Sequence, residues 1–283
     1  MSVVLITGCS SGFGMRAALH LARRGDTVVA TMREPAKGRE LERARGDENL
    51  DLEVAALDVS DDASVEAAVG RVLERHGHID VLVNNAGVGI DGAVEDVTDA
   101  EAKAVFETNV FGVLRVLRAV LPSMRRQGGG TVVNVSSLAG RVSAPFGGIY
   151  SASKYALEAI SEALHYELGP FGIRVAVIEP GGFPTEFDAN RHVAADDDRS
   201  PYADLRAAWE TAYERLPGRD GPPADPDVVA VAIGDAARDD GHPLRRLVGD
   251  DAELIGALRA DLDDAAFEQS IRTALDFWTG ARR

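Results

Sequence analysis

Short apolar runs rich in β-branched residues alternate with longer stretches of helical periodicity along most of this 283-residue chain. Runs that are apolar throughout are typical of parallel strands covered by helices on both faces. The alternation predicts an α/β fold with a doubly wound, mostly parallel sheet in a single domain. The predicted strands are 3–6, 27–31, 52–57, 79–83, 131–135 and 174–178, and the predicted helices are 13–24, 62–76, 99–126 with a break, and 150–168.

The first predicted strand leads directly into the glycine-rich stretch TGCSSGFG. Gly8, Gly12 and Gly14 stand at the turn, and Phe13 begins the next helix. Backbone N–H groups and the positive end of a helix dipole bind phosphate there, because glycine lets the anion approach closely. The spacing G-x-x-x-G-x-G is also compatible with a tight structural turn, but its place after the first strand favours a phosphate site.

Polar residues follow the fourth and fifth predicted strands. The loop NNAG occupies 84–87, and Ser136 and Ser137 follow the strand at 131–135. Ligands of open parallel sheets bind outside the carboxyl ends of the strands, so these residues are expected to share one crevice with the glycine turn. Taken alone, two adjacent asparagines at a strand end also suit an ordinary turn.

Tyr150 and Lys154 stand four positions apart in the stretch YSASK, with three small residues between them. On a helix they project from the same face, and the small residues leave room for a ligand. The chain has only three lysines among its 30 basic residues, so a lysine one turn from a tyrosine is notable. The alternative is an ordinary helix start with a partly buried tyrosine.

The ordered set of these motifs resembles the short-chain dehydrogenase/reductase family, over roughly residues 2 to 187. The start TGCSSGFG, the stretch ATMRE and the stretch PFGG are similar to the branch with 17-beta-hydroxysteroid and retinol dehydrogenases. The resemblance implies a Rossmann fold, a nicotinamide cofactor and no metal. The implied catalytic residues are Asn109, Ser137, Tyr150 and Lys154. The implied cofactor-binding residues are Gly8, Ser10, Ser11, Gly12, Phe13, Gly14, Arg33, Asp58, Val59, Asn85, Ala86, Gly87, Tyr150, Lys154, Pro180, Gly181, Phe183 and Thr185.

The family mechanism implied for these residues is hydride transfer between the nicotinamide and a carbonyl carbon, with Tyr150 as the general acid/base. A free tyrosine is a poor base at neutral pH. An ammonium about 4 Å away, at an effective dielectric near 20, favours the phenolate by about 4 kcal/mol before desolvation subtracts from it. The resemblance assigns that charge to Lys154, the substrate oxygen to Ser137 and a proton-feeding water chain to Asn109.

The residues after the second strand predict the cofactor. Sites for NAD usually place an acid there for the ribose 2′-hydroxyl, and here Met32 occupies that position and Arg33 follows. A guanidinium suits the 2′-phosphate, so we predict that NADP(H) is preferred over NAD(H). A solvated Arg33 is the alternative, and Glu34 is close enough to weaken the argument.

The substrate is predicted to be an apolar alcohol or ketone. Five aromatic residues stand where the family places its pocket and lid, although aromatic residues in helices are more often core. They are Phe146, Phe183, Phe187, Tyr202 and Trp209. Residues 186–283 carry a net charge of −10 and are predicted to be an acidic lid and C-terminal extension, with helical pieces at 202–215, 226–238 and 251–260. The segment 244–252 resembles the family's last strand, which often lies at an assembly edge, so a homo-oligomer, dimer or tetramer, is expected.

Composition excludes several other classes. A net charge of −16 is the wrong sign for a protein that binds nucleic acid through its phosphates. The single cysteine, Cys9, excludes an internal disulfide framework and a cysteine-rich metal site. No apolar run approaches the ~20 residues of a membrane helix, and the start does not resemble a signal peptide. A cytoplasmic protein with a small-molecule substrate is therefore expected.

Three functions remain open at this point. The leading one is an NADP(H)-dependent short-chain alcohol dehydrogenase or ketone reductase. A nucleotide-sugar epimerase or dehydratase shares the tyrosine and lysine but usually has another glycine spacing and a larger C-terminal domain. A non-catalytic NADP(H)-sensing regulator is the third, although such proteins commonly lose the tyrosine or the lysine.

Overall fold

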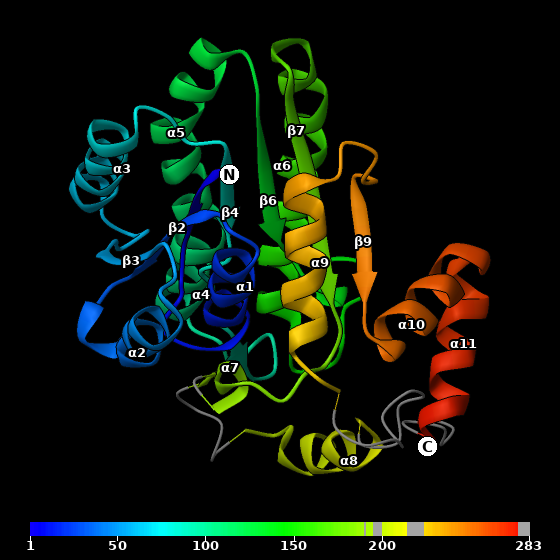
Figure 1. The fold of residues 1–283 in the computed structure, drawn as a ribbon. Coiled ribbons are helices and arrows are strands. Elements are labelled where there is room, and N and C mark those ends of the chain that lie inside the picture. Colours follow the sequence, from blue (N-terminus) through cyan, green and yellow to red (C-terminus); the bar gives the residue numbers. More distant parts are fainter. Residues whose placement is uncertain (190, 195–199, 214–223, 277–283) are drawn as a thin grey trace.

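The computed structural model describes residues 1–189, 191–194, 200–213 and 224–276. In this part of the chain, seven parallel strands form one sheet in the order β3-β2-β1-β4-β6-β7-β9, which confirms the predicted doubly wound sheet (Figure 1). The strands are β1 (Val3–Ile6), β2 (Thr27–Met32), β3 (Leu52–Ala56), β4 (Val81–Asn84), β6 (Gly130–Val135), β7 (Ile173–Pro180) and β9 (Arg245–Val248).

The strand order reverses at β1. Val4 lies opposite Val28 of β2 on one side and opposite Val81 of β4 on the other. From β1 the chain moves outward to β2 and β3, and then returns to β4, β6 and β7 on the other side. Such a switch point leaves a crevice outside the carboxyl ends of the strands, which is where open α/β sheets bind their ligands.

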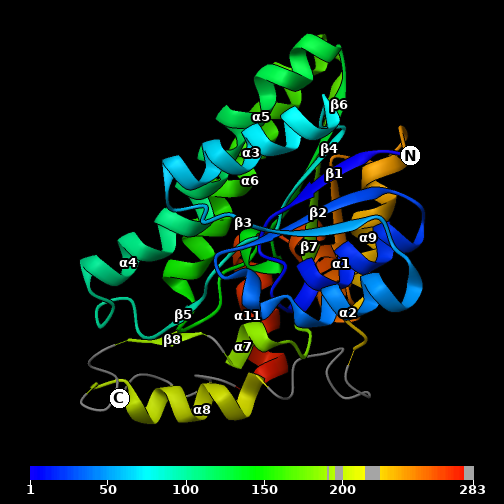
Figure 2. The same ribbon diagram turned by 60° about the vertical axis from the view of Figure 1, so that its left-hand side comes forward.

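Helices cover both faces of the sheet (Figures 1 and 2). One face packs against α1 (Gly12–Arg23), α2 (Arg39–Glu48) and α9 (Asp227–Arg238). The other face packs against α3 (Asp62–His76), α5 (Val113–Gln127) and α6 (Gly148–Leu168). In α5, the buried residues recur at the spacing of one helical stripe, which is why the helix lies flat on the sheet. Among the described helices, none has both the length and the apolar character that crossing a membrane requires.

The break predicted within 99–126 is a π-helical turn. Helix α4 (Asp99–Phe106) begins with a capping box in which Thr98 and Glu101 bond each other's backbone N–H groups. The π-helical turn (Glu107–Gly112) follows, and α5 continues the chain without a loop. Wide turns of this kind are often found at functional sites, and this one contains Asn109.

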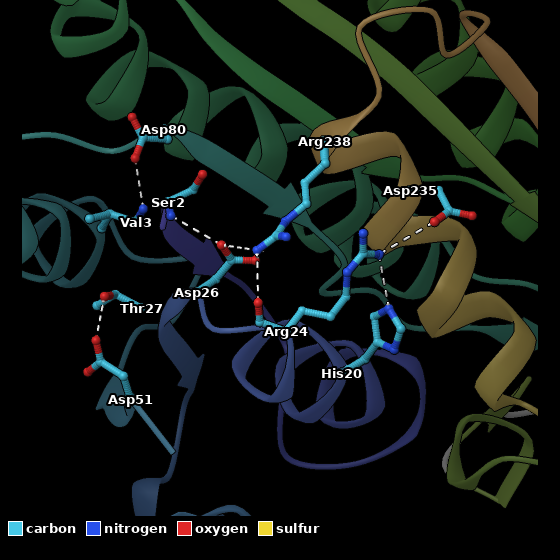
Figure 3. Close-up of polar contacts among 10 residues, drawn as sticks. All are labelled: Ser2, Val3, His20, Arg24, Asp26, Thr27, Asp51, Asp80, Asp235 and Arg238. Atoms are coloured by element: carbon cyan, nitrogen blue, oxygen red, sulfur yellow. Dashed lines mark hydrogen bonds and ion pairs between the residues drawn. The ribbon is translucent and has the colours of Figure 1, made fainter. Parts of the chain in front are cut away.

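Helix α9 is fixed to the N-terminal part of the sheet by an ion pair whose carboxylate is buried. Asp26 is only 1% exposed and accepts hydrogen bonds from Arg238, the last residue of α9, and from the backbone N–H of Ser2 (Figure 3). A Cβ at Gly234 would lie 2.7 Å from the His20 ring, so the glycine allows α9 and α1 to approach closely. Part of the acidic segment 186–283 thus belongs to the main helical layer.

The remaining C-terminal elements lie beyond the carboxyl ends of the strands (Figure 2). Helices α8 (Ala203–Tyr213), α10 (Asp250–Asp261) and α11 (Asp264–Leu275) share a separate apolar cluster around Ile255 and Leu275. Short α7 (Glu186–Ala189) and a two-stranded parallel sheet of β5 (Ile90–Asp91) and β8 (His192–Val193) lie beside them. The predicted helices at 202–215, 226–238 and 251–260 correspond to α8, α9 and α10, although 214 and 215 lie outside the described residues.

Candidate active site

A cavity of about 1350 Å³ opens at the carboxyl ends of the strands. It extends from the glycine turn after β1, past the ends of β4 and β6, to the inner sides of α8 and α11. Ser137, Tyr150 and Lys154 line it, as does the segment from Pro180 to Gly182. Most of the residues that the sequence placed in one crevice therefore meet in one cavity, whereas Gly14, Asn84 and Asn109 do not line it.

The glycine turn is shaped by the neighbouring NNAG loop. Gly8 has φ +74°, and a Cβ there would lie 2.7 Å from the Cα of Ala86. The side chain of Asn85 donates hydrogen bonds to the carbonyls of Thr7 and Gly8, at 2.9 and 3.0 Å. A Cβ at Gly14 would collide with that amide. Two of the glycines are thus required by close contact, and Asn85 holds the turn while it lines the cavity.

The open side of this turn suits a diphosphate. Gly12 also has a positive φ, +57°, and the nearest atom to a Cβ built on it belongs to Thr185, 3.8 Å away across the cavity. Ser10, Ser11 and Phe13 line the same wall. The turn opens helix α1, whose first N–H groups face an anion at this position. The residues present therefore fit a dinucleotide.

Lys154 is buried at the centre of the site. Its ammonium donates a 2.9 Å hydrogen bond to the carbonyl of Val135 and lies 5.8 Å from the centre of the Tyr150 ring. Burial lowers the pKa of Lys154 to about 8, and the nearby charge of Glu158 partly opposes this shift. A lysine with such a pKa is still mostly an ammonium at neutral pH, close to the tyrosine that needs the positive charge.

Ser137 lies at the end of β6 and begins a 3₁₀ turn (Leu138–Gly140). Its hydroxyl accepts a hydrogen bond from the backbone N–H of Ala139 at 3.1 Å. Because this 3₁₀ turn packs against α6, Ser137 and Tyr150 line the same cavity. The hydroxyl and the phenol can therefore address one substrate oxygen.

Asn109 connects the loop after β4 to helix α6. Its carboxamide oxygen accepts from the N–H of Val88, and its amide nitrogen donates to the carbonyl of Val88 and to the hydroxyl of Ser153. Asn109 is 1% exposed, and its side-chain amide is occupied by these bonds. The Asn109 side chain therefore links the loop after β4 to helix α6 by hydrogen bonds.

The far end of the cavity carries several cations. Asp58 and Val59 line it beside Met32 and Arg33, as the sequence predicted. Lys37 and Arg39 line the same end, and all three cationic residues are exposed. The sequence reasoning missed Lys37 and Arg39, although they lie within six residues of Arg33. Among the described residues, no group of three or more His, Cys, Asp or Glu side chains could hold a metal ion.

The loop after β7 closes the cavity. Pro180, Gly181, Phe183 and Thr185 line it. Phe183 is 5% exposed and packs edge-on against Phe13, so it joins the core more than it borders the cavity. The N–H of Gly182 donates to Asp251 of α10 at 2.8 Å. Asp251 could not be predicted from the sequence, because the contact joins segments 69 residues apart.

Four of the five predicted pocket aromatics line this cavity, and Tyr202 does not. They are Phe146, Phe183, Phe187 and Trp209. Tyr202 lies in a neighbouring depression beside Ala93 and Glu95. Phe187 lies 5.7 Å from the Tyr150 ring, centre to centre.

Comparison with known proteins identifies the family. The sequence model of short chain dehydrogenases matches residues 2–195. The chain belongs to this family. This short-chain dehydrogenase is similar to 3-ketodihydrosphingosine reductase of Bacteroides thetaiotaomicron. The two chains are 42% identical over 193 residues, with 68% of each chain covered.

Two vertebrate enzymes confirm the predicted branch of short-chain dehydrogenases. The chain is 45% identical over 189 residues to retinol dehydrogenase 8 of Bos taurus, covering 65% of this chain and 60% of that one. It is 43% identical over 192 residues to 17-beta-hydroxysteroid dehydrogenase type 1 of Homo sapiens, covering 66% and 58%. The match thus spans about three fifths of each vertebrate enzyme.

Solved short-chain dehydrogenases have the same fold. One from Streptomyces avermitilis has a TM-score of 0.77 at 36% identity, covering 96% of this chain and 99% of its own. Actinorhodin polyketide ketoreductase, solved with NADPH, has a TM-score of 0.75 at 30% identity, covering 87% and 94%. A 3-ketoacyl-(acyl-carrier-protein) reductase from Brucella melitensis, solved with NADH, has a TM-score of 0.73 at 28% identity, covering 88% and 96%. The two reductases thus hold different nicotinamide cofactors on the same fold, NADPH in one and NADH in the other.

Proposed function

We propose that this short-chain dehydrogenase is an NADP(H)-dependent oxidoreductase that interconverts an alcohol and a ketone or aldehyde, with preference for an apolar substrate. The observation that carries the proposal is the convergence of Ser137, Tyr150 and Lys154 on one cavity that continues from the glycine turn. A sensor without turnover would not need all three groups at this place.

The bound nicotinamide supplies or accepts the hydride. Tyr150 gives its proton to the substrate oxygen in reduction and takes it back in oxidation. Ser137 holds that oxygen by a hydrogen bond, and the buried ammonium of Lys154 favours the phenolate of Tyr150. Asn109 keeps α6 and the loop after β4 in register, so these groups stay aligned.

Three features support NADP(H) over NAD(H). At the position where an acid would bind the ribose 2′-hydroxyl, the chain has Met32, which is uncharged and buried. No carboxylate at this position therefore repels a 2′-phosphate. Arg33, Lys37 and Arg39 give this end of the cavity a positive charge. Glu34 pairs with Lys37 at 2.9 Å, which leaves Arg33 as the better candidate for the 2′-phosphate.

The outer part of the cavity supports an apolar substrate. Ile255 of α10, Ile271 and Leu275 of α11 and Trp209 of α8 line it, and Leu138 packs in the same apolar cluster. An apolar ligand gains free energy by removing such a wall from water. The names of the relatives, which include retinol, hydroxysteroid and ketodihydrosphingosine enzymes, favour the same class. The homo-oligomer and the cytoplasmic location stay predictions.

The test is oxidation of NADPH and of NADH by the purified protein, with apolar ketones, steroids, retinal-like aldehydes and polar sugars as substrates. The Tyr150→Phe variant is assayed in parallel. We expect turnover with apolar carbonyls, a higher kcat/KM with NADPH, and loss of turnover but not of NADPH binding in Tyr150→Phe. Equal efficiency with NADH would contradict the cofactor preference, and turnover that survives Tyr150→Phe would contradict the mechanism.

A further inference from the structure

A second cation lies against the proposed catalytic tyrosine. The guanidinium of Arg191 is 5.6 Å from the centre of the Tyr150 ring and 6.0 Å from that of Phe187. This is as close as the ammonium of Lys154, at 5.8 Å. Arg191 comes from the segment before β8, more than 30 residues beyond Lys154, and its side chain is 26% exposed. Tyr150 is therefore accompanied by two cations from two unrelated elements.

The position of Arg191 is fixed by the small β5–β8 sheet. The N–H of His192 donates to the carbonyl of Gly89 at 3.0 Å, and that of Ala194 donates to Asp91 at 2.9 Å. The carboxylate of Asp91 pairs with the Arg191 guanidinium at 3.2 Å. Both the backbone and the side chain of this segment are thus fastened to the loop that follows β4.

Two glycines make this arrangement possible. A Cβ at Gly89 would lie 3.0 Å from Cγ and Nε of Arg191 and 3.1 Å from the Phe187 ring. A Cβ at Gly92 would lie 2.5 Å from the Cβ of Ala194. A side chain at Gly89 would require the Arg191 side chain or the Phe187 ring to shift, and one at Gly92 would require the segment at Ala194 to shift. The two glycines therefore allow the β8 segment and the Arg191 side chain to pack closely against the loop after β4.

We propose that Arg191 is a positioning residue for the acid/base chemistry: its guanidinium, held by Asp91 and the β5–β8 sheet, stabilises the phenolate of Tyr150 together with Lys154. A cation over an aromatic face is attracted by the ring, and more strongly when the ring carries negative charge. Asp91 moderates this effect because it partly neutralises the guanidinium. The role rests on the proposed function, in which Tyr150 exchanges the proton.

Other charged and titratable groups line the cavity around Tyr150 and must be separated from Arg191. They are Lys154 on α6, Asp91 on β5, Glu186 on α7, His192 on β8, and Arg206 and Glu210 on α8. Arg206 and Glu210 pair with each other at 3.2 Å, so they place opposite charges side by side. Glu158 acts on Lys154 from one helical turn further along. His192 is exposed, and a His192→Gln variant tests whether its titration contributes.

The experiment is an ultraviolet titration of the Tyr150 phenolate, which needs neither substrate nor turnover. The chain has five tyrosines, so each protein is compared with its own Tyr150→Phe counterpart and the difference isolates Tyr150. We expect Arg191→Gln to move the midpoint up by about one pH unit, because a stabilising charge is lost. Arg191→Lys should recover part of the shift. Asp91→Asn should move the midpoint down by about half a unit, because the guanidinium is no longer neutralised.

The outcomes separate this role from a structural one. If Arg191 only fastens β8, thermal stability falls in Arg191→Gln while the midpoint stays at its wild-type value, and the proposal is overturned. Shifts of Arg191→Gln and Asp91→Asn in the same direction also overturn it, as does a shift in His192→Gln equal to that in Arg191→Gln. A shifted midpoint in a protein without turnover would support this role and contradict the proposed function alone.

Discussion

Lys154 donates a 2.9 Å hydrogen bond to the carbonyl of Val135, so its ammonium is tied to the last residue of β6 as well as to helix α6. The bond holds the charge beside the substrate end of the cavity, where Tyr150 and Ser137 also lie. It also explains how a 5% exposed lysine retains its proton at neutral pH, since the carbonyl partly replaces the water that burial removed.

The titration of Lys154 can be observed directly. Its pKa is lowered to about 8 by burial, whereas the carboxylate of Glu158 raises it. Removing that negative charge should lower the pKa further, so we expect Glu158→Gln to lose the Lys154 charge at a lower pH than the wild type. Because the chain has three lysines, ¹³C-labelled lysine gives three NMR signals, and Lys154→Met identifies the relevant one.

The control is Glu162→Gln. Glu162 is on the same helix and pairs with Arg245, the residue that also bonds Glu158, but its side chain is 51% exposed. Its removal should leave the Lys154 midpoint near the wild-type value. An unchanged midpoint in Glu158→Gln would show that Glu158 does not act on Lys154.

Glu179 makes the stability of the protein dependent on pH. Its pKa is raised to about 7, first by burial and second by the neighbouring Glu158, against the opposing charge of Arg141. Between the ordinary glutamate pKa and about 7, the folded state therefore binds more protons than the unfolded state. The free energy of unfolding must then fall as pH rises through this window.

We expect Glu179→Gln to flatten this dependence. The fall in the free energy of unfolding between about pH 5 and pH 8 should shrink by about 2 kcal/mol, because the variant has no carboxyl to ionise. Urea unfolding at a series of pH values measures the slope, and Glu162→Gln is the matched surface variant. A slope as steep as in the wild type would mean that Glu179 is already ionised at low pH.

The sequence predicted the sheet and the main site residues because each depends on a local pattern. The six predicted strands are short runs dominated by apolar and β-branched residues, and the motifs at Gly8, Ser137 and Tyr150 occur at strand or helix ends whose positions the fold determines. Helix α11 also had a readable signal, since Phe267, Ile271 and Leu275 recur every fourth residue after the cap Asp263. That helix could have been predicted.

Other features depend on contacts that periodicity does not encode. The β5–β8 sheet contains two residues per strand, too few for any pattern, and it brings Arg191 to a tyrosine 41 positions earlier. Asp251 accepts a hydrogen bond from Gly182, which lies 69 residues earlier in the chain. The position of Glu158 near Lys154 could have been predicted, because the two residues are four positions apart on one helix, but the burial of Glu158 depends on the packed structure.

Because Asn109 links the loop after β4 to helix α6 by hydrogen bonds, replacing it should lower both the stability and the activity of the protein. In Asn109→Ala, the partly buried N–H and carbonyl of Val88 lose their side-chain partner, and the Ser153 hydroxyl keeps only its bond to the carbonyl of Tyr150. We expect the free energy of unfolding to fall by about 3 kcal/mol, since each unsatisfied buried group is costly. Ser153→Ala removes one of the three Asn109 bonds and the bond from Ser153 to the carbonyl of Tyr150, but it leaves both Val88 bonds intact, so it should cost less. Urea unfolding compares the two variants. Equal losses would show that the contacts with Val88 contribute little.

Arg33 should carry most of the discrimination between the cofactors. Without its guanidinium, Arg33→Ser should lose about tenfold in kcat/KM for NADPH, because a charge-assisted contact with the 2′-phosphate is lost. The value for NADH should change little. Arg43→Ser, an exposed arginine on α2, controls for the general loss of positive charge. Parallel losses with both cofactors would place Arg33 outside the phosphate site.

Gly8 and Gly25 form a matched pair that separates backbone strain from close contact. Both have a positive φ, +74° and +86°, so an alanine is strained at either position. Around Gly25 nothing lies within 4 Å of a Cβ, whereas at Gly8 the Cβ would meet the backbone of Ala86 at 2.7 Å. We expect Gly25→Ala to cost about 1 kcal/mol of stability and to keep NADPH binding. Gly8→Ala should cost more, because the glycine turn and the NNAG loop must separate, and fluorescence titration with NADPH should show weaker binding. Equal effects of the two substitutions on NADPH affinity would mean that the contact between Gly8 and Ala86 does not shape the dinucleotide site.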